Sequence, residues 1–152
     1  MADVVSPAVR SRMMSGIKGK NTKPEIVVRK ALFAAGYRFR LHRKNLPGAP
    51  DIVLAGRRVA IFAHGCFWHM HTECNNAKLP STHPEFWLAK LQGNVDRDYR
   101  TSEALRVMGW RVLTVWECGT RDPKTSGLLP TLLSRWIEGM ESIGEISAVT
   151  NR

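Results

Sequence analysis

The sequence predicts one α/β domain, in which a mixed β-sheet is flanked by helices. Short apolar runs typical of strands occur at residues 52–54, 59–62 and 111–116. Segments with helical periodicity lie before, between and after them, an order that fits a sheet covered by helices. The chain has 152 residues, which suits one domain and is ample for one hydrophobic core.

The first elements follow from capping signals. Residues 6–18 begin with Ser-Pro and carry basic side chains around Met13 and Met14, so this stretch is too polar for a core. Thr-Lys-Pro-Glu at residues 22–25 is a capping box that opens a helix ending at Gly36, and we expect this helix to pack on the sheet.

Alternation and turn residues then indicate strands. Residues 37–41 alternate apolar and arginine side chains, which predicts a half-buried strand with a basic outer face. Residues 46–50 (LPGAP) form a turn-rich connector. The apolar runs at 52–54 and 59–62, separated by AGRR, predict a hairpin.

The second half is predicted to contain helices around one more strand. Residues 84–91 and 95–108 have helical character, with a stop at Gly109, and residues 111–116 form a dense apolar strand. A last helix begins near Pro130. The expected organisation is a separate segment at 1–20, the domain at 21–140 and a tail at 141–152.

Charge and cysteine usage narrow the functional classes. The formal net charge of +10 is spread along the chain and favours a polyanionic partner, although a basic solvated surface is the alternative. No apolar run is long enough to span a bilayer and the start lacks a leader pattern, so we expect a cytoplasmic protein. Three cysteines in a reducing compartment favour metal binding over disulfides.

A dense cluster of histidine and cysteine residues predicts a structural zinc site. Cys66, His71 and Cys74 have the spacing of tetrahedral zinc ligands, and Cys118 could supply the fourth. His69 could replace His71. The alternative is that the cysteines are small buried side chains.

The hairpin also predicts a hydrolytic site. If it turns about Arg57, Asp51 lies opposite Ala63 with His64 next along. The Asp51 carboxylate and the main-chain carbonyl opposite could hold Mg²⁺, while His64 and His69 could move a proton. Alternatively, Asp51 is a turn residue and the histidines lie on the surface.

The aromatic residues divide into two groups. Phe67 and Trp68 follow one another in the zinc loop and could wedge between base pairs. Trp110, Trp116 and Trp136 are expected in the core, and Trp87 could belong to either group.

The sequence resembles the very short patch repair endonucleases of bacteria. The matching stretches occur in order along nearly the whole chain: residues 10–25 (RSRMMSGIKGKNTKPE), 46–51 (LPGAPD), 61–74 (IFAHGCFWHMHTEC), 85–97 (EFWLAKLQGNVDR) and 109–118 (GWRVLTVWEC). The resemblance implies a restriction-endonuclease-like fold and a strand-specific nick 5′ to the thymine of a T:G mismatch left by deamination of 5-methylcytosine.

The same resemblance assigns roles to residues. It implies that Asp51 binds magnesium, that His64 and His69 assist hydrolysis, and that zinc is held by Cys66, His71, Cys74 and Cys118. It further implies intercalation by Phe67, Trp68 and Trp87, and an approach of Met13 and Met14 to the minor groove. Glu25 lies in a family motif, although its capping role explains it equally well. Ala63 replaces a threonine of one relative, a harmless change if the main-chain carbonyl binds the metal.

The expected partner is therefore double-stranded DNA with a T:G mismatch, cut by a monomer that acts at the nucleoid, possibly alongside mismatch-repair and resynthesis proteins. Two other functions fit the residues. One is a zinc-containing DNA-binding module without catalysis, for which the basic surface would suffice. The other is a site-specific endonuclease that cuts both strands.

Overall fold

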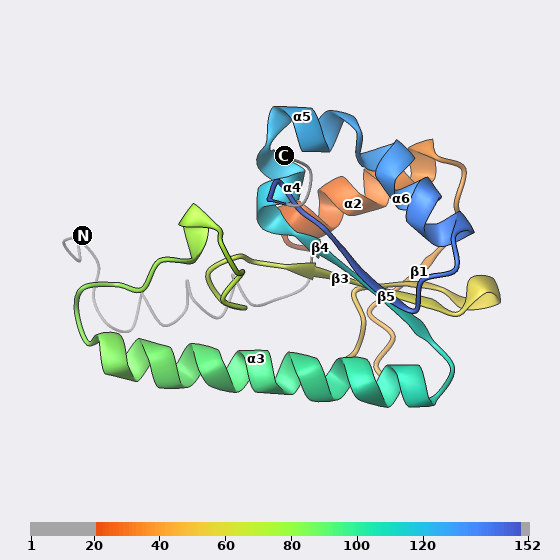
Figure 1. Ribbon diagram of the computed structural model, residues 1–152. Coiled ribbons are helices and arrows are strands. Elements are labelled where there is room, and N and C mark those ends of the chain that lie inside the picture. Colours follow the sequence, from red (N-terminus) through yellow and green to blue (C-terminus); the bar gives the residue numbers. More distant parts are fainter. Residues whose placement is uncertain (1–20, 150–152) are drawn as a thin grey trace.

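A five-stranded mixed sheet forms the centre of the computed structural model, which describes residues 21–149 (Figure 1). The strands follow in the order β1 (Arg40–Leu41), β2 (Ile52–Leu54), β3 (Val59–His64), β4 (Arg111–Trp116) and β5 (Ile143–Ile146). The pairs β1–β2 and β2–β3 are antiparallel, whereas β3–β4 and β4–β5 are parallel. The predicted mixed sheet with flanking helices is confirmed. The predictions for residues 1–20, including Met13 and Met14, lie outside the described residues.

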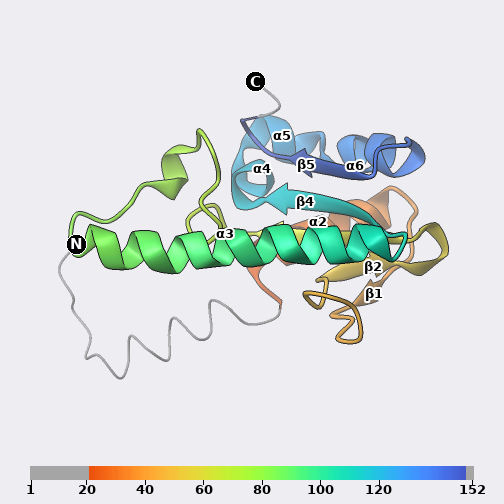
Figure 2. The same ribbon diagram turned by 60° about the horizontal axis from the view of Figure 1, so that its bottom comes forward.

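Helices cover both faces of the sheet, but unequally. The helices α2 (Lys23–Ala34), α4 (Glu117–Arg121), α5 (Pro123–Gly127) and α6 (Leu129–Glu138) lie on one face, and α3 (Pro84–Val107) lies on the other (Figures 1 and 2). One core cluster fills the space between the sheet and the four helices, and a smaller one lies under α3. Trp110 and Trp116 are buried as expected, and Trp136 is partly buried.

The start of α2 agrees with the capping signal. The Thr22 side chain accepts a hydrogen bond from the Glu25 backbone amide, and Gly36 takes a φ of +92° just after the helix. Val28 and Leu32 are fully buried, while Phe33 is 62% exposed. The helix therefore packs through one face, against α6 and β3.

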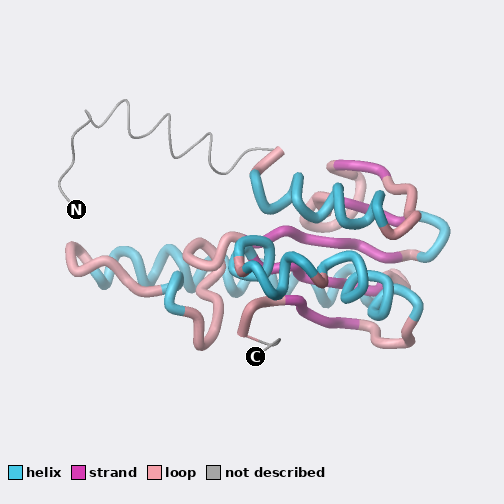
Figure 3. Tube along the Cα trace, turned by 90° about the horizontal axis from the view of Figure 1, so that it is seen from above, coloured by secondary structure: helices cyan, strands magenta, loops and turns pink. Residues whose placement is uncertain are grey.

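The α3 helix is one continuous element of 24 residues, not the two segments that the sequence indicated. Gly93 lies within it, because a helix held at both ends tolerates one glycine at a cost of about 1 kcal/mol. Only Leu91 and Leu105 are buried. The amino-terminal half extends past the end of the sheet, where it meets the loop between β3 and α3 (Figures 1 and 3).

Two parts of the sheet differ from the prediction. β1 is confined to Arg40–Leu41, because Tyr37 is buried against α6 instead, with its hydroxyl 2.6 Å from a Glu138 carboxylate oxygen. Residues 141–152 were expected to be a tail, yet 143–146 form β5 beside β4. β5 is an edge strand in which only Ile146 is buried, so it lacks a clear apolar alternation. α4 and α5 were not predicted either.

Among residues 21–149, no helix has both the length and the apolar character required to span a bilayer.

Candidate active site and metal centre

The β2–β3 hairpin brings Asp51 to the end of β3. Ile52 pairs with Ile61, which places Asp51 across from Phe62, so the expected pairing with Ala63 is wrong by one residue. The difference arises in the turn, where a short 3₁₀ helix (Ala55–Arg57) is followed by a left-handed residue at Arg58. The Asp51 carboxylate nevertheless reaches Ala63, whose backbone amide donates a hydrogen bond of 2.8 Å to Oδ2.

Two histidines face each other beside this carboxylate. The rings of His64, at the end of β3, and His69, in the following loop, stack with centroids 3.7 Å apart and planes 2° from parallel. Burial and the neighbouring His69 lower the pKa of His64 to about 3. The His64 ring is therefore neutral at neutral pH, which revises the expectation that it changes charge there.

His69 has a partner that the sequence did not indicate. Its Nδ1 lies 2.5 Å from Oδ2 of Asp98, on α3. Asp98 escaped notice because it comes from a separate element, 29 residues further along the chain, and because a single aspartate on a charged helix has no distinctive pattern. The part of the chain that would have pointed to it is the contact between α3 and the loop, which only the tertiary structure provides.

A cleft of about 780 Å³ contains all of these groups. Burial raises the pKa of the Asp51 carboxyl, and the hydrogen bond from the Ala63 amide opposes that rise. A cation near Asp51 would favour the charged carboxylate. The rest of the lining comes from the start of α2, the loop after β3 and the middle of α3, and it includes Glu25, Phe67, Trp68, Asn94, Arg97 and Thr101.

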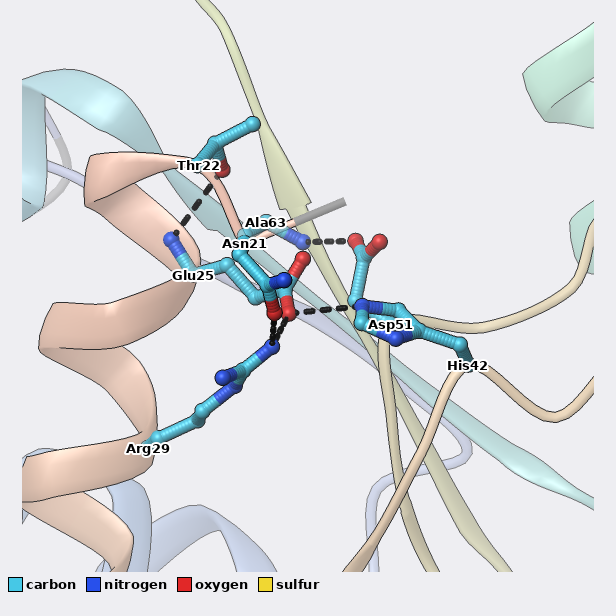
Figure 4. Close-up of polar contacts among 7 residues, drawn as sticks. All are labelled: Asn21, Thr22, Glu25, Arg29, His42, Asp51 and Ala63. Carbon is cyan, nitrogen blue, oxygen red and sulfur yellow. Dashed lines mark hydrogen bonds and ion pairs between the residues drawn. The ribbon is translucent and has the colours of Figure 1, made fainter. Parts of the chain in front are cut away.

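Glu25 contributes more than a helix cap. Its backbone amide completes one half of the capping box, but its carboxylate bonds to Arg29 and to Nε2 of His42, at 2.7 Å (Figure 4). The side chain is almost fully buried. Capping alone therefore does not explain the position of this carboxylate, and neither Arg29 nor His42 was singled out in the sequence.

The predicted zinc ligands gather at one point. The donor atoms of Cys66, His71, Cys74 and Cys118 all lie within 4.8 Å of one another. Sulfur atoms around tetrahedral zinc lie about 3.8 Å apart for Zn–S bonds of about 2.3 Å, so these residues fit the ion. His69 belongs instead to a group with His64 and Asp98, which leaves His71 as the histidine at the cysteine cluster.

Packing also favours metal binding at this cluster. The His71 ring stacks on Trp116 with centroids 4.1 Å apart, and burial lowers its pKa, so the ring is held as the neutral form that binds metals. Cys118 follows β4 directly, and its backbone amide donates to Sγ of Cys66 at 3.3 Å. Burial raises the pKa of the Cys66 thiol when no metal is considered.

Three aromatic side chains form a cluster at the mouth of the cleft. The centroids of Phe67 and Trp68 are 5.1 Å apart, and Trp87 of α3 lies 5.6 Å and 6.0 Å from them. All three are partly exposed. Trp87 thus lies with the loop aromatics and not in the core. The side-chain amide of Asn94 donates to the Trp68 carbonyl at 2.9 Å and ties the loop to α3.

Comparison with known proteins bears on the same residues. A family model described as DNA mismatch endonuclease Vsr matches residues 2–76. The DNA mismatch endonuclease Vsr of Escherichia coli is 43% identical over 148 residues, 96% of this chain and 94% of that protein. The chain belongs to the Vsr family.

Other Vsr-like relatives are named as nicking enzymes. The type II nicking enzyme V.XorIIP of Xanthomonas oryzae pv. oryzae is 48% identical over 122 residues, which cover 80% of this chain and 89% of that protein. The type II nicking enzyme V.NmeAIP of Neisseria meningitidis is 42% identical over 118 residues, 78% of this chain and 84% of that protein. The resemblance noted in the sequence is thereby confirmed at the level of the family.

Proposed function

We propose that this protein is a magnesium-dependent DNA endonuclease that nicks one strand 5′ to the thymine of T:G mismatches arising from deamination of 5-methylcytosine. The observation that carries the proposal is the convergence of Asp51, His64, His69 and Asp98 in one cleft beside a Cys₃His cluster. Membership of the Vsr family supports the mismatch substrate, and the names of the nicking relatives support cleavage of a single strand.

Asp51 and the main-chain carbonyl of Ala63 would hold Mg²⁺. In a strand, the N–H and C=O of one residue point to the same side, so the hydrogen bond from the Ala63 amide to Asp51 places the carbonyl on the Asp51 side as well. Two oxygen ligands with room for water and phosphate suit this ion. Bound there, Mg²⁺ would stabilise the negative charge that develops on the phosphodiester and lower the pKa of water.

His69 is the base in this proposal. With Nδ1 directed at Asp98, its proton stays on that nitrogen and the Nε2 lone pair is available to accept a proton from the attacking water. Asp98 would then stabilise the imidazolium that forms. The neutral His64 ring, stacked on His69, fixes the plane of the base and leaves no second positive charge against it.

The zinc ligands have a structural role in this proposal. Four protein ligands leave no open position on a tetrahedral ion, so zinc would not take part in hydrolysis. Instead it would tie the loop that carries His69 to the end of β4, where Cys118 lies. This anchors both the base and the aromatic pair between Cys66 and His71.

The aromatic cluster would engage the mismatch. Phe67, Trp68 and Trp87 are partly exposed at the mouth of the cleft, where stacking on bases could replace the stacking lost in a distorted duplex. The net charge of +10 supports contact with the phosphates. The roles of Met13 and Met14 in the minor groove, a monomeric state and a cytoplasmic location remain expectations.

A cleavage assay tests the proposal. Zinc-loaded protein is incubated with Mg²⁺ and a duplex labelled on both strands, containing either T:G, T:A or C:G at one position. We expect a single nick 5′ to the thymine of T:G, its loss in Asp51→Ala, and its retention in the control Asp96→Asn, which alters an exposed carboxylate of α3. Cutting by Asp51→Ala at the wild-type rate contradicts the proposal. Binding without cutting indicates a non-catalytic module, and cleavage of both strands indicates a double-strand endonuclease.

A further inference from the structure

A group of three possible metal ligands lies next to the proposed cutting site. The donor atoms of Glu25, His42 and Asp51 all lie within 4.8 Å of one another, although they come from α2, the segment after β1 and the segment before β2 (Figure 4). The backbone fixes two of them, because the His42 amide donates to the Asp51 carbonyl at 3.0 Å. His42 takes a φ of +48° there, an uncommon conformation for a residue with a side chain.

The Glu25 carboxylate has one oxygen to spare. Its bonds to Arg29 and to His42 both use Oε2, and within residues 21–149 no hydrogen bond uses Oε1. Figure 4 shows this second oxygen on the side of Ala63 and Asp51. The Glu25 side chain is only 2% exposed, so an unused carboxylate oxygen here is costly unless a cation or water binds it.

We propose that Glu25, His42 and Asp51 form a second divalent-cation position, which accepts Mn²⁺ in preference to Mg²⁺. The geometry fits, since neighbouring ligands of an octahedral ion at about 2.1 Å lie about 3 Å apart. The His42 Nε2 to Glu25 Oε2 distance of 2.7 Å needs to lengthen only by a few tenths of an ångström. The position rests on the proposed cutting site, with which it shares Asp51.

The imidazole determines which ion the position selects. Mg²⁺ is bound by oxygen ligands, whereas imidazole nitrogen suits ions later in the transition series. Mn²⁺ accepts both donor types and is the weakest of these ions in affinity, so it does not displace zinc from the thiolates of the Cys₃His cluster. Two buried carboxylates close together also favour a cation between them, because Arg29 and His42 both act on the same oxygen of Glu25.

Pulsed electron paramagnetic resonance on Mn²⁺ tests this position directly. Zinc-loaded protein without DNA is titrated with Mn²⁺, and coupling of the bound ion to ¹⁴N is recorded for the wild type, His42→Gln, Glu25→Gln and His83→Gln. His83 is the control, since it is the one histidine in none of the candidate metal groups. Zinc content and melting temperature report whether each variant is folded.

We expect ¹⁴N coupling in the wild type and in His83→Gln, and its loss in both His42→Gln and Glu25→Gln. The Kd for Mn²⁺ should rise roughly ten- to a hundredfold in His42→Gln, with a smaller change for Mg²⁺. Coupling that persists in His42→Gln would assign the nitrogen to His64 or His69 and overturn the position, as would a wild type without coupling. Because no DNA is present, a failure to nick T:G duplexes would reject the proposed function and leave this result intact.

Discussion

The Nδ1 atom of His69 lies 2.5 Å from Oδ2 of Asp98, which joins the loop after β3 to the middle of α3. This contact orients the ring, fixes its tautomer and gives the imidazolium form a counter-charge. It makes Asp98 a positioning residue of the proposed reaction.

Replacing Asp98 should therefore slow hydrolysis without weakening DNA binding. For Asp98→Asn we expect kcat on a T:G duplex to fall about a hundredfold or more, because the amide can no longer hold the His69 proton on Nδ1. Single-turnover cleavage and a binding isotherm in Ca²⁺ separate the two effects. Asp96→Asn, two positions away on the exposed side of α3, should behave as wild type. An Asp98→Asn variant that cuts at full speed would remove Asp98 from the mechanism.

Loss of a zinc ligand should destabilise the loop and the end of β4 together. We expect about one equivalent of zinc in the purified protein and none in Cys118→Ser, with a loss of unfolding free energy on the order of 3 kcal/mol or more. Elemental analysis and thermal denaturation measure these quantities. Thr72→Ala, an exposed change between two ligands, is the matched control. Purified wild type without zinc would show that the cysteines serve only as packing.

Removing an aromatic side chain should weaken recognition of the mismatch. For Trp68→Ala we expect T:G binding to lose about 1–3 kcal/mol, the range of base–aromatic stacking, with a smaller loss on a fully paired duplex. Fluorescence anisotropy at fixed ionic strength gives both values. Phe33→Ala removes an exposed aromatic from the outer side of α2 and should change neither. Unchanged T:G affinity in Trp68→Ala would mean that the cluster only packs against α3.

The contact between Tyr37 and Glu138 should make stability depend on pH in two ranges. Hydrogen bonds from Tyr37 and Arg57 lower the pKa of Glu138, so its stabilising effect is present above its ordinary pKa of 4.5 and is lost as pH falls through the lower folded value. Burial and the bond to Glu138 raise the pKa of Tyr37, so that contribution is present below 10 and is lost as pH rises through the higher folded value.

Denaturant unfolding at several pH values checks this prediction. Tyr37→Phe should flatten the alkaline decrease in unfolding free energy and part of the acid decrease, whereas Glu141→Gln, on an exposed side chain, should alter neither. Identical pH profiles for wild type and Tyr37→Phe would contradict the argument.

Much of the local structure could be predicted because short-range rules dominate it. The α2 cap at Thr22 and its stop at Gly36, the β2–β3 hairpin and the apolar β4 each have a signal within a few residues. Weakly patterned elements were missed. β5 has only one buried residue, and α3 continues through Gly93 because its stability comes from packing at its two ends.

The same division holds for the site. The spacing of Cys66, His71 and Cys74 already indicated a metal cluster, and Asp51 with His64 indicated a cutting site, because these residues are close in the chain or joined by one hairpin. The choice of His71 over His69, the role of Asp98 and the place of His42 beside Glu25 came only from the tertiary structure. The physical reason is that a side chain's charge and hydrogen-bonding partners depend on distances across elements, which the order of residues along one chain does not specify.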